Sequence, residues 1–176
     1  MRYRFDGKQP VVGKTSYISE IAQVIGDVVI GDDCYIGHGA ILRGDYGRIV
    51  IGDGASVEEG AIVHAPPGDV NRIGKHVTVG HGAILHGEEV GDHAVIGMGS
   101  VIGIWSKIGE WSILAEGSIV KRRQIIPPEV VVAGNPATIV RKLAEKDKEF
   151  SSRRQQIYIE LVKKYLEAGM TAIGNR

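Results

Sequence analysis

Three histidines near the middle of the chain have the residue type and the spacing of metal ligands. His64 and His86 each directly follow a branched aliphatic residue, and His81 lies five residues before His86. Imidazole nitrogens bind Zn²⁺ at about 2.0–2.1 Å, and a site with three of them keeps a fourth position open for water. A metal held in this way lowers the pKa of its bound water to about 7. These residues therefore predict a metal centre that activates water.

A six-residue repeat provides the elements that must position these side chains. A branched aliphatic residue recurs every six positions, with three interruptions, and glycine or another small residue follows it at fixed offsets. The repeated positions are Val12, Ile18, Val24, Ile30, Ile36, Leu42, Ile51, Val57, Val63, Ile73, Val79, Leu85, Val90, Ile96, Ile102, Ile108, Leu114 and Val120. This period is typical of a parallel β-helix, in which the aliphatic side chains point inward. We predict an all-β solenoid of about six triangular coils over residues 1–120, with three hexads in each coil.

The interruptions of the repeat coincide with polar residues. They occur directly before Arg43, His64 and His86, where intervals of nine, ten and five residues replace the regular six. The three hexads concerned are three apart, so they lie on one face in successive coils. We expect the three polar side chains to point outward and to stack about one strand spacing apart. Irregularities of this kind in a solenoid map to loops on a binding face.

His81 belongs to a neighbouring face of the predicted prism. It cannot easily reach a metal held by His64 and His86 of its own chain, whereas it can reach the metal of an adjacent subunit. This placement predicts a closed cyclic oligomer, and a triangular prism suits a trimer. A plain surface or interface histidine is the alternative for His81. Arg43 and Asp45 can equally form a surface ion pair of little energetic effect.

The motifs at these positions resemble the gamma-class carbonic anhydrase family of left-handed β-helix proteins. They are Arg43-Gly44-Asp45, Glu58-Glu59-Gly60-Ala61-Ile62-Val63-His64, Val79-Gly80-His81-Gly82-Ala83-Ile84-Leu85-His86-Gly87, Ala133-Gly134-Asn135-Pro136-Ala137 and Tyr158-Ile159-Glu160-Leu161. The resemblance implies a left-handed homotrimer. It implies Zn²⁺, or Fe²⁺ or Co²⁺, between His64 and His86 of one subunit and His81 of its neighbour. It also implies an ion pair of Arg43 and Asp45 between subunits.

The chain departs from the pattern of this family in three respects. Glu58 stands where the family commonly has Gln, and Ser56 stands where Asn is expected. A long acidic loop with a proton-shuttling Glu is absent, since only 16 residues separate His64 from His81. Glu58 is therefore a candidate acceptor of a hydrogen bond or a proton from the bound water, and Tyr158 is a further candidate catalytic residue. A solvated charge for Glu58 and helix packing for Tyr158 are the alternatives.

The resemblance implies a lyase that hydrates CO₂ reversibly to bicarbonate with metal-bound hydroxide. Residues 43–50 also resemble the branch associated with phenylacetate and carnitine metabolism, which implies a metal-dependent acyl-CoA thioesterase. CoA-dependent acyl transfer, as in other hexapeptide proteins, would use one histidine and no metal. A trimeric scaffold that keeps the metal for its structure is the non-catalytic alternative. Imidazole ligands suit several metals, so they do not identify the native one.

Composition narrows the class of protein. The chain has 176 residues with 21 basic and 21 acidic side chains, so its charge does not indicate nucleic acid or a membrane surface as partner. The single Cys34 excludes an internal disulfide and fits a reducing compartment. The N-terminus has no apolar segment of a signal peptide, and no apolar run reaches the length of a membrane span. We therefore expect a cytoplasmic protein.

The last third of the chain is expected to form a separate unit, residues 121–176. Residues 121–136 predict an extended connector, because Pro127-Pro128 and Gly134-Asn135-Pro136 are turn signals. A helix is expected from about Ser151 to Glu167, with Gly169 as its stop, and we expect it to pack along the prism. Its apolar stripe consists of Ile157, Tyr158, Leu161, Val162 and Tyr165.

Overall fold

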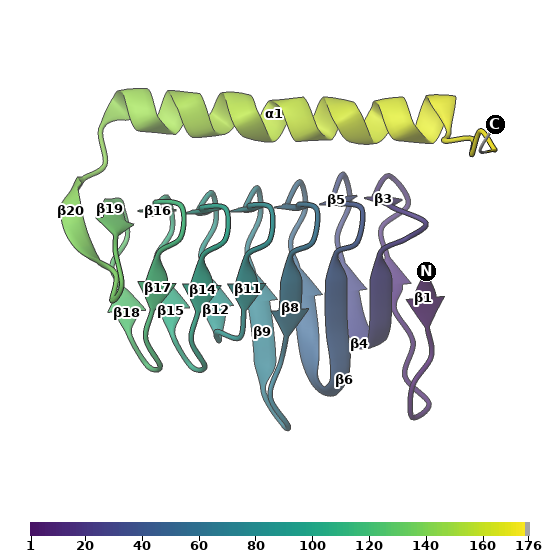
Figure 1. The fold of residues 1–176 in the computed structure, drawn as a ribbon, viewed down its shortest axis with the longest axis horizontal. Helices are drawn as coiled ribbons and strands as arrows, with labels where there is room; N and C mark the ends of the chain where they lie inside the picture. Colours follow the sequence, from purple (N-terminus) through teal and green to yellow (C-terminus); the bar gives the residue numbers. More distant parts are fainter. Residues whose placement is uncertain (175–176) are drawn as a thin grey trace.

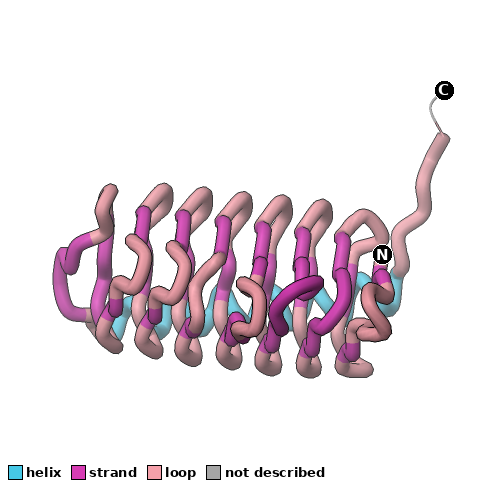
Figure 2. Tube along the Cα trace, turned by 90° about the horizontal axis from the view of Figure 1, so that it is seen from below, coloured by secondary structure: helices cyan, strands magenta, loops and turns pink. Residues whose placement is uncertain are grey.

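The computed structural model describes residues 1–174, which form one parallel β-solenoid with a single long helix beside it (Figure 1). About seven coils are stacked along one axis, and the helix α1 (Glu145–Ala168) runs along the stack. Figure 2 shows the successive coils as evenly spaced loops with the helix behind them. The predicted left-handed parallel β-helix with a C-terminal helix is confirmed, with one coil more than expected.

Two sheets form the walls of the solenoid. The larger sheet contains β1 (Arg2–Tyr3), β2 (Val11–Val12), β4 (Gln23–Ile30), β6 (Ile41–Ile51), β8 (Ile62–His64), β9 (Val70–Ile73), β11 (Ile84–Leu85), β12 (Glu89–Val90), β14 (Val101–Ile102), β15 (Lys107–Ile108), β17 (Ile119–Val120) and β18 (Ile125–Ile126). The smaller sheet contains β3 (Tyr17–Ile18), β5 (Tyr35–Ile36), β7 (Ser56–Val57), β10 (Thr78–Val79), β13 (Val95–Ile96), β16 (Ile113–Leu114), β19 (Val130–Ala133) and β20 (Thr138–Lys142). The larger sheet covers two faces of the prism, because the long strand β6 pairs with β8 through its first residues and with β9 through its last.

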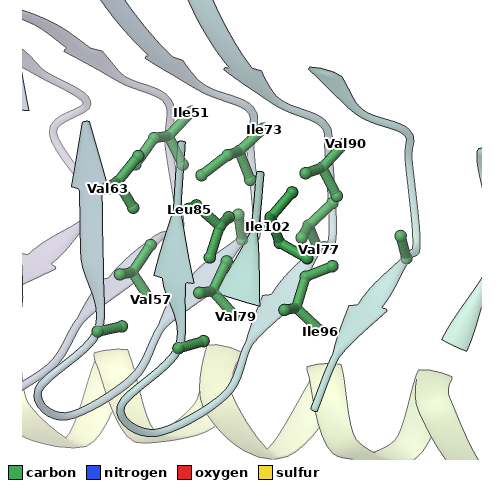
Figure 3. Close-up of a cluster of buried hydrophobic side chains, with 14 of the residues drawn as sticks. Ile51, Val57, Val63, Ile73, Val77, Val79, Leu85, Val90, Ile96 and Ile102 are labelled. Carbon is green, nitrogen blue, oxygen red and sulfur yellow. The ribbon is translucent and has the colours of Figure 1, made fainter. Parts of the chain in front are cut away.

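The inward-facing aliphatic side chains form ladders from coil to coil. Val63 is the register partner of Leu85, and Leu85 is the partner of Ile102. All three are at most 1% exposed, and Figure 3 shows them stacked beside the ladder that contains Val57 and Val79. Full burial of one such side chain contributes about 1.5–3 kcal/mol. The six-residue repeat thus supplies both the register and the core.

The coils continue past Val120, where we expected an extended connector. Strand β18 pairs with β15, strand β19 pairs with β16, and Ile126 and Val132 are buried. Both side chains keep the six-residue spacing, but Lys121 and Pro127 stand where glycine usually follows the aliphatic residue. The antiparallel strand β20 then covers the edge of β19 and ends the stack. A division into two domains at residue 120 stays a prediction, and coil pairing runs across that position.

Helix α1 begins at Glu145, earlier than the predicted start near Ser151. The carboxylate of Asp147 accepts a hydrogen bond from the N–H of Ala144 at 2.8 Å, and acidic groups in the first turn suit the positive end of the helix dipole. At the other end Gly169 has a φ of 67° and closes the helix as predicted. No helix of residues 1–174 is long and apolar enough to cross a membrane.

Aromatic side chains fix α1 on the solenoid. Tyr165 stacks on Tyr17 with ring centroids 4.4 Å apart, and Tyr158 lies 5.3 Å from Tyr35. The helix therefore packs against the strands β3 and β5. Ile157 belongs to the predicted apolar stripe of the helix, but its side chain is 60% exposed. The face of α1 toward the solenoid is thus largely aromatic and polar.

Candidate metal and catalytic site

The register of one face brings Arg43, His64 and His86 into a single column. Arg43 and His64 are direct partners in the β6–β8 pairing, and the β8–β11 pairing places His86 one coil further on. The Nδ1 atom of His64 lies 2.9 Å from the Nε2 atom of His86, and the ring centroids are 4.7 Å apart. The predicted stack is confirmed, and two imidazoles from successive coils meet where the hexad repeat is interrupted.

Asp45 joins this column from the same strand as Arg43. Its Oδ2 atom accepts a hydrogen bond from Nη1 of Arg43 at 2.9 Å, and its Oδ1 atom lies 3.6 Å from Nε2 of His64. Burial raises the pKa of Asp45, but the hydrogen bond and the charge of Arg43 outweigh burial and hold it below its ordinary value. The carboxylate therefore stays ionised beside His64. The ion pair lies within one chain here, whereas the resemblance implied a pair between subunits.

Both imidazoles of the column favour the neutral form. Burial lowers the pKa of His64, and the positive charges of Arg43 and His86 lower it further against the opposing effect of Asp45. Burial and the charge of Arg43 lower the pKa of His86 as well. A neutral imidazole has the free lone pair that a metal requires. The Nε2 atom of His64 is buried without a hydrogen-bond partner among the described residues, so the pair fits two positions of a metal centre.

His81 lies at a different corner, in the turn between β10 and β11, and contacts carboxylates. The backbone N–H of His81 donates a hydrogen bond to Oε2 of Glu58 at 3.1 Å. The ring Nε2 atom of His81 also lies 3.1 Å from the same oxygen. Its Nδ1 atom lies 2.7 Å from Oε2 of Glu59, and 45% of its side chain is exposed. Among residues 1–174 no three His, Cys, Asp or Glu side chains form a metal-binding group. The structure therefore does not bring His81 to His64 and His86 within one chain.

Glu58 is fully buried at the base of the His81 corner, so the alternative of a solvated charge is wrong. Its Oε1 atom has no hydrogen-bond partner among the described residues and lies 3.6 Å from Nη2 of Arg154. Arg154 and Tyr158 are four residues apart and so share one face of α1. Burial raises the pKa of Tyr158, and the charge of Glu58 raises it further. The apolar stripe of the helix does not include Arg154, although the spacing of four residues between Arg154 and Tyr158 was an available signal.

The candidate residues thus form two groups at two corners of the prism. The imidazole corner consists of Arg43, Asp45, His64 and His86. The carboxylate corner consists of Glu58, Glu59, His81, Arg154 and Tyr158. A surface hollow over β9, β12, β15 and β18 includes neither group. Each corner holds what the other lacks, since one provides two neutral imidazoles and the other a third imidazole beside an acceptor carboxylate.

The repeat and the fold define a hexapeptide β-helix protein, and sequence comparisons agree. The family described as "Bacterial transferase hexapeptide (six repeats)" matches residues 9–44, and "Hexapeptide repeat of succinyl-transferase" matches residues 27–65 and 70–103. The carnitine operon protein CaiE of Escherichia coli O157:H7 is 39% identical over 91% of this chain and 82% of its own length. The mitochondrial gamma carbonic anhydrase 2 of Arabidopsis thaliana is 36% identical over 88% of this chain. The chain belongs to the family of hexapeptide-repeat β-helix proteins that includes CaiE, and it is similar to gamma carbonic anhydrases.

Solved structures share the fold closely. A hexapeptide transferase family protein from Anaplasma phagocytophilum is 34% identical, with a TM-score of 0.88 over 93% of this chain and 97% of that one. A protein from Bacillus cereus described as a candidate acetyltransferase is 32% identical, with a TM-score of 0.90 over 93% of this chain and 95% of that one. The chain spans 58% of the length of the Arabidopsis relative. The names of these hexapeptide-repeat relatives include a carbonic anhydrase and an acetyltransferase, so the family has more than one named activity.

Proposed function

We propose that this protein hydrates CO₂ reversibly to bicarbonate, at a metal centre shared between subunits of a homotrimer. His64 and His86 of one subunit and His81 of its neighbour would hold Zn²⁺, or Fe²⁺ or Co²⁺. One observation carries the proposal: Nδ1 of His64 lies 2.9 Å from Nε2 of His86 at one corner, while the imidazole of His81 lies at another. The similarity to gamma carbonic anhydrases supports the reaction.

The residues of the imidazole corner would hold and orient the ligands. A divalent metal, when bound, would acidify water and so supply a nucleophile at neutral pH. Arg43 keeps Asp45 ionised, and the Oδ1 atom of Asp45 lies 3.6 Å from Nε2 of His64, so a negative charge faces the imidazole column. Burial and the positive charge of Arg43 both lower the pKa of His64 and of His86 and so favour their neutral forms.

The carboxylate corner of the neighbouring subunit would complete the site. Glu58 presents an oxygen without a hydrogen-bond partner among the described residues, and we assign it as the acceptor of a hydrogen bond from the reacting water. It takes the place of the Gln that the family commonly has. Tyr158 lies beside Glu58, and burial raises the pKa of its phenol, so it stays protonated and can donate a hydrogen bond at neutral pH.

Hydrolysis of an acyl-CoA thioester at the same centre is the second candidate. The 39% identity to CaiE, named for a carnitine operon, supports the resemblance to the carnitine-associated branch, from which this candidate comes. CoA-dependent acyl transfer is the alternative that the acetyltransferase-like structures suggest, and it needs no metal. Stoichiometric bound metal that is required for activity would count against acyl transfer.

Subunit complementation tests the shared site. His64→Ala and His81→Ala trimers are each expected to lose metal and CO₂ hydration when purified anaerobically and assayed with Zn²⁺, Co²⁺ or Fe²⁺. Trimers refolded from an equal mixture place an intact His64 against an intact His81 at about a quarter of the interfaces, so about a quarter of the activity returns. His76→Ala is the matched control, since this histidine stacks on His93 at another corner.

The outcome separates the candidate reactions. Elemental analysis and a thioesterase assay on the same samples show whether the restored centre binds metal and which substrate it uses. Full activity and metal content in His81→Ala alone would refute the shared centre. If the protein binds the three metals but hydrates CO₂ with none of them, the proposed reaction is refuted. The proposed metal centre between subunits would still stand.

A further inference from the structure

A cationic turn lies on the same face as the imidazole corner. Lys121, Arg122 and Arg123 directly follow β17, and all three are exposed. The β11–β14 and β14–β17 pairings place this turn two coils beyond His86, at about 10 Å by two strand spacings. None of the three cations forms an ion pair within the part of the chain that the structure describes. The positive charge of the turn is therefore unneutralised.

Two of these cations, Arg122 and Arg123, lie over the indole ring of Trp105. The Cζ atoms of Arg122 and Arg123 lie 4.4 and 4.6 Å from the ring centroid of Trp105. The ring is itself held by a hydrogen bond from its Nε1–H to Oδ2 of Asp69 at 2.7 Å, in the loop between β8 and β9. Two guanidinium groups on one ring repel each other, and a bound anion would remove this repulsion. Their N–H donors match the geometry of phosphate oxygens.

We propose that Trp105, Lys121, Arg122 and Arg123 form a binding site for the phosphate groups of a phosphorylated small molecule. The spacing of about 10 Å from His86 keeps the phosphates away from the reacting centre and leaves room for an uncharged arm that reaches the histidines. Coenzyme A thioesters have this chemistry, as do free diphosphates and nucleotides. The role of the site in catalysis rests on the proposed thioester reaction, whereas phosphate binding does not.

Tryptophan fluorescence measures the binding directly. The chain has two tryptophans, so Trp111→Phe leaves Trp105 as the only reporter. Titration of this assembled protein with coenzyme A, ADP and inorganic pyrophosphate is expected to give a saturable change with a Kd below about 1 mM. High salt weakens the binding, because the contacts are exposed and ionic.

Charge-matched variants localise the site. Arg122→Gln with Arg123→Gln in the reporter background is expected to weaken binding at least about tenfold, because two charge-assisted contacts are lost. Lys163→Gln with Lys164→Gln removes the same charge from an exposed part of α1 and should leave the Kd unchanged. If the arginine double variant does not fold, each single arginine variant should weaken binding about threefold or more.

The three probes distinguish the sources of the phosphate. If coenzyme A binds more tightly than pyrophosphate, the site contacts the nucleotide part of the ligand as well as its phosphates. If the two bind equally, the site contacts the diphosphate alone. Absence of a saturable signal with every probe, in fluorescence and in calorimetry, overturns the proposal. Equal weakening in the Lys163–Lys164 control overturns it too. These titrations measure binding and not turnover. A protein that hydrates no CO₂ and hydrolyses no thioester would therefore refute the proposed reaction but not the phosphate site.

Discussion

Arg154→Gln removes the cation that faces the buried carboxylate of Glu58, and we predict a loss of stability that Glu58→Gln abolishes. Glu58 is fully buried, and Nη2 of Arg154 lies 3.6 Å from its Oε1 atom. The Oε2 atom of Glu58 keeps its contacts with His81, but loss of the guanidinium leaves Oε1 buried with less compensation of its desolvation penalty. An amide at position 58 carries no charge, so it does not need the guanidinium. The effects of the two substitutions should therefore be strongly non-additive.

The expected magnitude follows from the distance and the exposure of the pair. Two unit charges 3.6 Å apart attract by about 4–5 kcal/mol at an effective dielectric constant of about 20. The side chain of Arg154 is 32% exposed, so solvent screens part of this attraction. We expect Arg154→Gln to destabilise the protein by about 2 kcal/mol, or about 4–8 °C in Tm. The same change in the Glu58→Gln background should alter stability by less than about 0.5 kcal/mol.

Thermal and urea unfolding of the four proteins of this cycle, loaded with Zn²⁺ and metal-free, measure the coupling. Arg153→Gln is the matched control, because this neighbour pairs with Glu149 at the surface and should contribute little. Zinc affinity provides a second measurement, since Glu58 also contacts His81. Equal destabilisation by Arg154→Gln in both backgrounds would refute the reasoning. It would mean that the guanidinium stabilises the protein through contacts other than Glu58.

Three further predictions concern the fold. The Arg141 hydrogen bond holds the pKa of Asp147 at about 2, so stability that is present above the ordinary value near 3.8 is lost as pH falls from about 4 to 2. In an acid titration followed by circular dichroism, the Asp147→Asn variant should lack the loss of stability that the unmodified protein shows between about pH 4 and 2. Burial raises the pKa of Cys34 to about 11, so a thiol reagent at pH 8 should react only after unfolding; rapid reaction of the native protein would contradict this. Leu85→Ala should cost about 2–5 kcal/mol in urea unfolding, and Ile84→Ala, at a position 43% exposed, much less.

Most of the fold could be predicted because a solenoid repeats its register. Once Val63 and Leu85 are assigned to one ladder, the residues that follow them must be neighbours in successive coils. The contact of His64 with His86 therefore follows from spacing alone. The last coil was missed for a local reason, because Lys121 replaces the glycine that marks most corners.

The contacts of α1 could not be predicted in this way, since a helix has no fixed register against the coils it packs on. The pair of Arg154 with Glu58 depends on the rotation of α1 about its axis, which the stacking of Tyr165 on Tyr17 helps to set. The start of the helix depends on the carboxylate of Asp147, which lies outside the apolar stripe. Long-range packing of this kind leaves only a weak trace in local sequence patterns.

The two corners also determine which assembly the proposed metal centre requires. His64 and His86 lie at one corner and His81 at another, so the contact that joins them pairs two different surfaces of identical chains. Such a contact is heterologous, and each end of an open assembly keeps one unpaired corner until a ring closes. An open dimer would complete one centre for two chains, whereas a closed trimer would complete one centre for every chain. Light scattering with elemental analysis should therefore give three times 18.9 kDa with about one metal per chain, and half a metal per chain would contradict the ring.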